Sequence, residues 1–389
     1  MYVFGQSTFP LLPKGVTIRS IKPTTPLTLT SVFSLTAILL IIGYTIDILI
    51  NLCFLKNFML RTKDIREKIR DIDDYLLDEY KKNHPEAKRD WRTYEQQLAA
   101  RLKYAIRNLE PLIGDAVSAI QVERSQGRTP ELSLKQRLIL ILVKELFDRS
   151  NRNMEAMLDL FCLLTDVDVS YKSIERLYSD PEVEMALHNL HSLILKKKGV
   201  QAVDGSGDGT GYSLQVSKHY ASEAMRRKDK VKEADESEKK AFVYSFKLLD
   251  LKSNLYVAYG LSFKSERQAF DRAKSMLQAL DVKLESIRLD KYYSCQTYFK
   301  ELENVTVYVL PKANATVKGP WSWKRQMREF VENTQDYLEE YYQRERSESE
   351  FSADKRWFGW SVAQRRDDRI ETAVTCANVW HNLFNLLPS

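Results

Sequence analysis

The most constraining stretch of this chain reads Tyr341-Tyr-Gln-Arg-Glu-Arg-Ser-Glu-Ser-Glu-Phe-Ser-Ala-Asp-Lys355. Its Tyr341, Arg344, Glu348, Phe351 and Lys355 recur at intervals of three, four, three and four residues, so on a helix they share one face. A carboxylate between two cations suits a divalent metal ion beside a phosphodiester, because the acid can hold the ion while Arg344 and Lys355 hold phosphate. The alternative is a solvated helix with ion pairs between successive turns.

Two further stretches each read as a β-strand that delivers a carboxylate at or near its end. The short apolar run 200–203 leads into Asp204 and then into Asp208, and the alternating run 284–289 ends in Asp290. Three carboxylates, two from strands and one from a helix, can build an all-oxygen site for Mg²⁺ or Mn²⁺. Two such ions, about 4 Å apart, would activate the attacking oxygen and stabilise the leaving oxygen of an in-line phosphoryl displacement.

These motifs resemble those of insertion-sequence transposases of the DDE type, in the group whose third acid lies in a Tyr-Arg-Glu-Lys signature. Three more strings are similar to those of unclassified, often archaeal, members: Gly207-Asp-Gly-Thr-Gly-Tyr-Ser-Leu, Arg288-Leu-Asp-Lys-Tyr-Tyr and Trp380-His-Asn-Leu-Phe-Asn. The resemblance covers about residues 132–389. It implies an RNase H-like catalytic domain.

By that resemblance, the chain is a DNA transposase that cleaves strands at transposon ends and joins the freed 3′ ends to target DNA. Asp208, Asp290 and Glu348 are then the catalytic and metal-binding triad for two Mg²⁺ or Mn²⁺ ions. Asp204 is an alternative first acid, because both aspartates head an Asp-Gly-(Ser/Thr)-Gly string. The implied partners are DNA and a second copy of the chain in a homodimer. Two alternatives stay open: an RNase H-like nuclease that cuts without joining, and an inactive transposase-derived DNA-binding protein.

Several residues near the acids are candidates for DNA contact. The basic or polar side chains that would touch phosphate or lie beside the site are Arg344, Lys355, Lys291 and Tyr341. Trp321 and Trp323, interleaved with Lys and Arg, would stack on an unpaired base. Alternatively, both tryptophans pack their segment against the sheet.

Residues 61–199 read as an all-helical DNA-binding region. Within it, 150–179 is a candidate helix-turn-helix, whose second helix begins after an N-capping serine. In that arrangement Tyr171, Lys172 and Arg176 would face the DNA groove. The alternative is a plain helical bundle without DNA contact.

Residues 200–389 read as the catalytic domain, of mixed α/β (α+β) class with a mixed five-stranded sheet. The expected strands are 200–208, 242–249, 255–263, 284–289 and 305–310. The expected helices are 266–280, the helix of the signature, and 368–387, and an insertion occupies about 311–340.

The first 60 residues do not fit this picture. Between residues 32 and 55 the only charge is Asp47, and the segment is long enough to cross a bilayer. It is a membrane anchor, a buried helix, or part of a dispensable extension. The net charge of +6 and four scattered cysteines otherwise agree with a cytoplasmic or nucleoid-associated nucleic-acid enzyme.

Overall fold

The computed structural model describes residues 60–83, 90–121, 131–147, 154, 157–159, 162, 168–214 and 242–387. The described residues all belong to one compact unit, Leu60–Ser389. The predicted apolar segment 32–55 therefore lies outside the described residues, as does most of 150–167. Among the helices that are described, none is long and apolar enough to cross a membrane.

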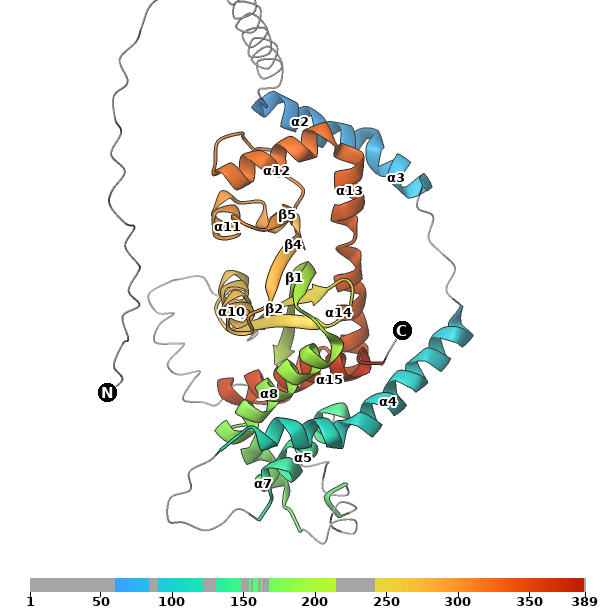
Figure 1. The fold of residues 1–389 in the computed structure, drawn as a ribbon, viewed down its shortest axis with the longest axis vertical. Coiled ribbons are helices and arrows are strands. Elements are labelled where there is room, and N and C mark those ends of the chain that lie inside the picture. The colour runs from blue at the N-terminus through green and yellow to red at the C-terminus, as the bar shows by residue number, and fades with distance from the viewer. Residues whose placement is uncertain are drawn as a thin grey trace, which may run out of the picture. The chain divides into compact units, whose positions relative to one another are not determined.

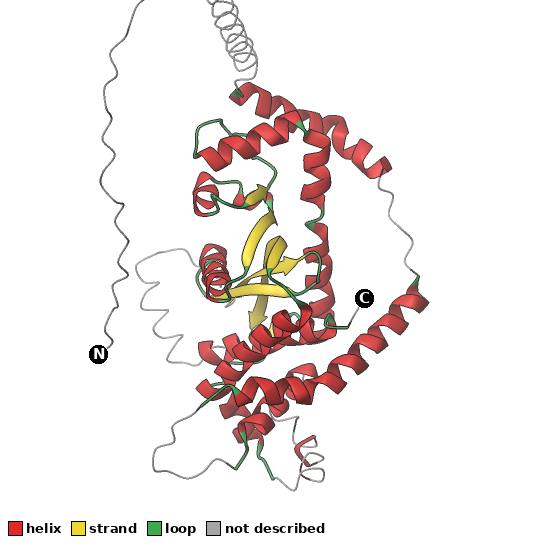
Figure 2. Cartoon of the chain, viewed as in Figure 1, coloured by secondary structure: helices red, strands yellow, loops and turns green. Residues whose placement is uncertain are grey.

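A mixed sheet forms the centre of the described unit (Figure 2). Its main path runs in the order β3-β2-β1-β4-β5, and β6 pairs with β1. β1 is antiparallel to β2 and parallel to β4 and β6; β2 is antiparallel to β3, and β5 is parallel to β4. The bounds are β1 Ala202–Leu214, β2 Phe242–Asp250, β3 Tyr256–Ser262, β4 Lys283–Leu289, β5 Thr306–Tyr308 and β6 Ser361–Val362. The predicted mixed sheet is confirmed, with the two-residue β6 as an unpredicted addition.

β1 is longer than the sequence indicated, and this corrects the predicted position of Asp208. The strand continues to Leu214, so Asp208 lies in its middle and not at its end. The glycines of this strand are sites of close packing, because a Cβ atom at Gly207 would lie 2.5 Å from Cζ of Phe246. Alternate small residues therefore let β1 pass beneath large side chains of β2 while the other face carries Asp208.

Helices cover both faces of the sheet (Figure 1). α10 (Glu266–Ala279) packs against β2 and β3, and its N-terminus is capped by Ser265, whose hydroxyl accepts from the Gln268 amide. On the opposite side, α13 (Thr334–Tyr342) packs on β4 and β5, and α14 (Glu345–Phe358) packs on β1. The signature was predicted to lie on a single helix. It lies instead on two successive helices that meet at Gln343 and Arg344.

The C-terminal helix joins the sheet to the helices that come earlier in the chain. α15 (Asp367–Phe384) packs against β3 and also against α4, α5 and α8. Its apolar residues are buried, and Trp380 Nε1 donates to the Leu142 carbonyl at 2.7 Å. α11 (Gln296–Glu301) packs on α12 (Trp321–Glu332), as does α2. The earlier elements are α2 Thr62–Asp71, η1 Ile72–Leu76, α3 Leu77–Asn83, α4 Trp91–Ser118, α5 Leu134–Leu146, α7 Tyr171–Leu177 and α8 Pro181–Lys198.

Candidate active site

Four charged side chains from three parts of the chain meet beside the middle of β1. Arg344 lies at the junction of α13 and α14, and its Nη1 is 3.2 Å from Asp208 Oδ2. The same nitrogen is 3.9 Å from Asp290 Oδ1 and 2.5 Å from Glu348 Oε1. One guanidinium nitrogen therefore contacts all three acids of the predicted triad, which the fold brings together.

Each acid owes its place to the element that carries it. β1 and β4 are parallel neighbours with Gly207 opposite Leu289, so the residues that follow, Asp208 and Asp290, emerge side by side. The Asp290 carboxylate also accepts from the Tyr292 amide at 3.2 Å, which caps the short turn after β4. Glu348 lies one turn after Arg344 on the helix and therefore faces the same strands.

The electrostatics of the cluster favour an additional cation. Burial raises the pKa of Asp208 to about 6, with smaller contributions from Asp290 and Glu348, while Arg344 acts in the opposite direction. Burial alone would lower the pKa of Arg344, but Tyr341 and the three acids outweigh it and raise that pKa. Three carboxylates around one guanidinium leave an excess of negative charge when all are ionised.

The donor set suits a hard metal ion, although the carboxylates are spaced around Arg344. Within the described ranges, no three Asp, Glu, His or Cys side chains already stand close enough to hold one ion. The reason is geometric, because Arg344 Nη1 fills the space between Asp208, Asp290 and Glu348. Carboxylate oxygens are the ligands that Mg²⁺ and Mn²⁺ prefer, so the chemistry of these three donors, though not their spacing, matches such an ion.

Asp204, the alternative first acid, has a different environment from Asp208. Its carboxylate accepts hydrogen bonds from Ser286 Oγ and from Arg288, and Arg288 also pairs with Glu340. Burial alone would raise the pKa of Asp204, but these two donors lower it instead. Asp204 therefore belongs to a structural ion pair, whereas Asp208 lies with Asp290 and Glu348.

The other signature residues flank this cluster. Tyr341 is buried, its ring lies 5.7 Å from the Arg344 guanidinium, and burial raises the pKa of its hydroxyl to about 12. Lys291, directly after Asp290, is exposed. Lys355 lies seven residues beyond Glu348, about 10 Å along α14, with Nζ 4.7 Å from the ring of Trp360. The structure thus keeps Lys355 on the same helix but outside the acid cluster.

The two tryptophans of the insertion have different surroundings, and one prediction is wrong. Trp321 is 65% exposed at the start of α12. Trp323 is only 3% exposed, donates from Nε1 to the Thr316 carbonyl at 2.8 Å and packs edge-on against Phe299. Trp323 cannot stack on a DNA base because its ring is part of the core.

The candidate helix-turn-helix is described only in its second half. Tyr171 is half-buried on α7, while Lys172 and Arg176 are exposed. The residue before the helix, Ser170, occupies the predicted N-cap position, although its hydroxyl contacts Ser173 Oγ at 3.3 Å. Most of the residues predicted to form the first helix of the motif lie outside the described ranges, so DNA binding by this motif stays a prediction.

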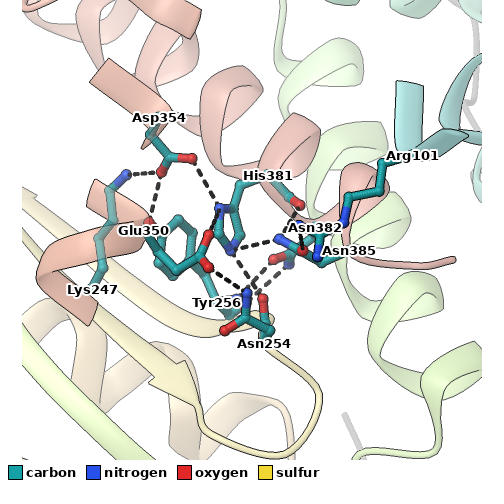
Figure 3. A network of polar contacts seen from close by, with 9 residues as sticks. All are labelled: Arg101, Lys247, Asn254, Tyr256, Glu350, Asp354, His381, Asn382 and Asn385. Carbon is teal, nitrogen blue, oxygen red and sulfur yellow. Dashed lines mark hydrogen bonds and ion pairs between the residues drawn. The ribbon is translucent and has the colours of Figure 1, made fainter. Parts of the chain in front are cut away.

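A buried polar network next to the acids was missed by the sequence analysis (Figure 3). It centres on Asp354 of α14, which contacts Lys247, Tyr256 and His381. The only local signal was Lys247, a lysine between two apolar residues of β2. Its partner is 107 residues away, so no short-range pattern could pair the two.

Comparison with known proteins adds one relative. No protein-family model matches the chain. The chain is 41% identical over 329 residues to a protein from Archaeoglobus fulgidus named a probable transposase for insertion sequence element ISA1214. The match covers 84% of this chain and 97% of that relative.

Proposed function

The chain belongs to the insertion-sequence transposases, and from this premise we propose that it is a DDE-type DNA transposase whose metal-binding acids are Asp208, Asp290 and Glu348. Its function as a DNA transposase follows from the family. The type of chemistry, the metal and the residues that hold it are our proposal. DNA, at the transposon ends and at the target, is the substrate. Two copies of the chain would act together.

One observation carries the assignment: a single nitrogen of Arg344 lies within 3.9 Å of carboxylate oxygens from all three acids. These acids come from β1, from the end of β4 and from α14, and they are far apart in the sequence. The strand order and the position of the acids agree with the RNase H-like domain that the sequence resemblance implies. The cluster lies on the side of the sheet that α13 and α14 cover.

The residues of the chain have distinct roles in this proposal. Two bound Mg²⁺ or Mn²⁺ ions would supply activation of the attacking oxygen and stabilisation of the leaving oxygen. The negative charges of Asp208, Asp290 and Glu348 would attract these ions, and their carboxylate oxygens would bind them. Arg344 turns from the carboxylates to a DNA phosphate, to which a guanidinium can donate two parallel hydrogen bonds. Lys355, further along α14, contacts a neighbouring phosphate.

The order of steps follows from the chemistry of the substrate. Water attacks a phosphodiester of one strand at each transposon end and breaks its P–O3′ bond, which leaves a 3′-hydroxyl and a 5′-phosphate. That hydroxyl then attacks a phosphodiester of the target and displaces the 3′-oxygen of the target strand, so one site serves both phosphoryl transfers. Exposed Lys291, next to Asp290, adds positive charge where the DNA backbone would pass.

The test is metal-dependent cleavage of DNA that carries the ends of the element. Asp290→Asn and Glu348→Gln keep the side-chain shape but remove an anionic ligand, so each should abolish cleavage while DNA binding persists. Glu345→Gln is the matched control, because this exposed acid lies on the same helix outside the cluster. Undiminished cleavage by either triad variant would refute the assignment.

A further inference from the structure

The buried network around Asp354 joins α14 and α15 to the sheet (Figure 3). Lys247 Nζ, from β2, lies 3.1 Å from Asp354 Oδ2, and the Tyr256 hydroxyl of β3 donates to the same oxygen at 2.6 Å. His381 Nδ1, from α15, lies 2.9 Å from Asp354 Oδ1. Lys247 and His381 are 1% and 2% exposed, so the network is closed to solvent.

The network continues beyond Asp354 into the β2–β3 turn. His381 Nε2 lies 3.0 Å from the Asn254 backbone carbonyl, and the side-chain amide of Asn254 donates to Glu350 at 2.6 Å. Asn382, next to His381, bonds both the amide and the carbonyl of Tyr256. Asp354 and Glu350 on α14 are therefore tied to the sheet and to α15 through directional contacts.

These contacts and the acid cluster share α14, and they also meet across the pairing of β1 with β2. Lys247 is the direct partner of Asp208 in the antiparallel pairing of β2 with β1. On α14, Glu348 lies between Asp354 and Ser347, whose hydroxyl lies 2.9 Å from Ser206 Oγ of β1. A slide or a rotation of α14 along the sheet would break contacts on both sides of Glu348.

Stability alone gives little reason for such a network. Burial would raise the pKa of Asp354, but His381 and Lys247 outweigh it and lower that pKa to about 2, so the carboxylate stays charged. Apolar residues of similar volume often replace a buried ion pair without loss of stability, whereas directional pairs can fix one arrangement. Metal ligands need such control, since a site works only when its ligands are held within about 0.5 Å.

We propose that Lys247, Asp354 and His381 are positioning residues that lock α14 onto the sheet and thereby set Glu348 at the right distance from Asp208 and Asp290. The inference rests on the proposed metal site. None of the three touches the acids. They act through the helix that carries Glu348.

The test measures Mn²⁺ affinity of the full-length chain by titration calorimetry, at a temperature where circular dichroism shows every variant folded. Asp354→Asn should weaken Mn²⁺ binding by about 10-fold or more, the range typical of residues that orient metal ligands. His381→Gln should weaken it in the same direction, and serves as the second variant if the first does not fold.

A paired substitution separates positioning from stability. Lys247→Met combined with Asp354→Asn leaves no unpaired buried charge, so it should recover most of the thermal stability lost in Asp354→Asn. Mn²⁺ affinity should stay low, because the directional lock is still absent. Recovery of affinity together with stability would overturn the proposal.

The control is Arg137→Met, which breaks another buried ion-pair cluster. Arg137 is 6% exposed and bonds Asp180 and Glu182 at the start of α8. This variant should lose stability and keep wild-type Mn²⁺ affinity. If Asp354→Asn behaves like it, with affinity within about twofold of wild type, the positioning role is refuted and the metal site stands. If Glu348→Gln itself leaves Mn²⁺ affinity unchanged, the proposed function fails, and this inference fails with it.

Discussion

Asp208 and Lys247 lie directly opposite each other on the antiparallel strands β1 and β2. The side chain of Asp208 contacts Arg344, and that of Lys247 contacts Asp354. Arg344 and Asp354 belong to one segment, because Arg344 is the N-cap residue of α14 and Asp354 lies within that helix. One cross-strand pair therefore connects the sheet to this helix at two points, one in the acid cluster and one in the buried network.

Arg344→Gln should have opposite effects on metal and on DNA. Removal of the guanidinium leaves three carboxylates without their shared cation, so we expect Mn²⁺ affinity without DNA to rise about 10-fold. Affinity for end DNA should fall, and its logarithmic salt dependence should flatten by about one unit, because one phosphate contact is lost. Calorimetry and fluorescence anisotropy at several salt concentrations measure the two effects. Unchanged values for both would return Arg344 to a structural role.

Substitution of the two aspartates of β1 should have different effects on stability and on DNA cleavage. Asp204→Asn removes one of the two acidic partners of buried Arg288 and leaves the other, Glu340. The substitution should therefore lower the free energy of unfolding by about 1–3 kcal/mol. Part of the cleavage activity should remain. Asp208→Asn should abolish cleavage. Denaturant unfolding and the end-cleavage assay check this pair, and a dead Asp204→Asn with an active Asp208→Asn would reverse the assignment.

Asp208 should also make stability depend on pH. Its pKa rises from 3.8 to about 6 on folding, chiefly by burial, so the folded protein holds this proton more tightly than the unfolded chain. The stabilisation of the folded protein by protonated Asp208 is fully present below about pH 3.8 and is lost as the pH rises through about 6. Asp208→Asn should therefore exceed wild type by about 1–3 kcal/mol at pH 8, with the gain vanishing near pH 4. Urea unfolding across this range measures it, and a variant less stable than wild type at pH 8 would contradict it.

Trp321 and Trp323 should respond differently to truncation. Trp323→Ala removes a core ring and should lower the free energy of unfolding by about 3–5 kcal/mol. Trp321→Ala should stay within about 0.5 kcal/mol of wild type, since its ring is exposed. If Trp321 stacks on an unpaired base, its truncation should weaken single-strand binding by about 1–3 kcal/mol. Unchanged single-strand binding would remove Trp321 from the DNA surface.

The sequence predicted the acid cluster because its signals are local. An alternating run that ends in an acid and a three-four spacing on a helix each depend on neighbouring residues, as for Asp290 and Glu348. The burial of Trp323 was also accessible in principle. Residues two apart on a helix point about 200° away from each other, so Trp321 and Trp323 could hardly share one exposed face.

Long-range packing explains what the sequence did not predict. The first strand was expected to end at Asp208, and its continuation to Leu214 depends on glycines such as Gly207, which packs against the Phe246 ring of another strand. The network of Lys247 joins strands and helices that are distant in the chain. Its partner Asp354 lies on the same face of the signature helix as buried Ser347 and Phe351, but no pattern within that helix indicates which distant residue its carboxylate contacts.

The most direct test of the metal site is an anomalous difference map from Mn²⁺-containing crystals of the protein with end DNA. The account predicts density within about 2.0–2.6 Å of carboxylate oxygens of Asp208, Asp290 and Glu348, with Arg344 displaced onto a phosphate. Density beside Asp204 instead, or none at the three acids in a complex that cleaves its DNA with Mn²⁺, would contradict it.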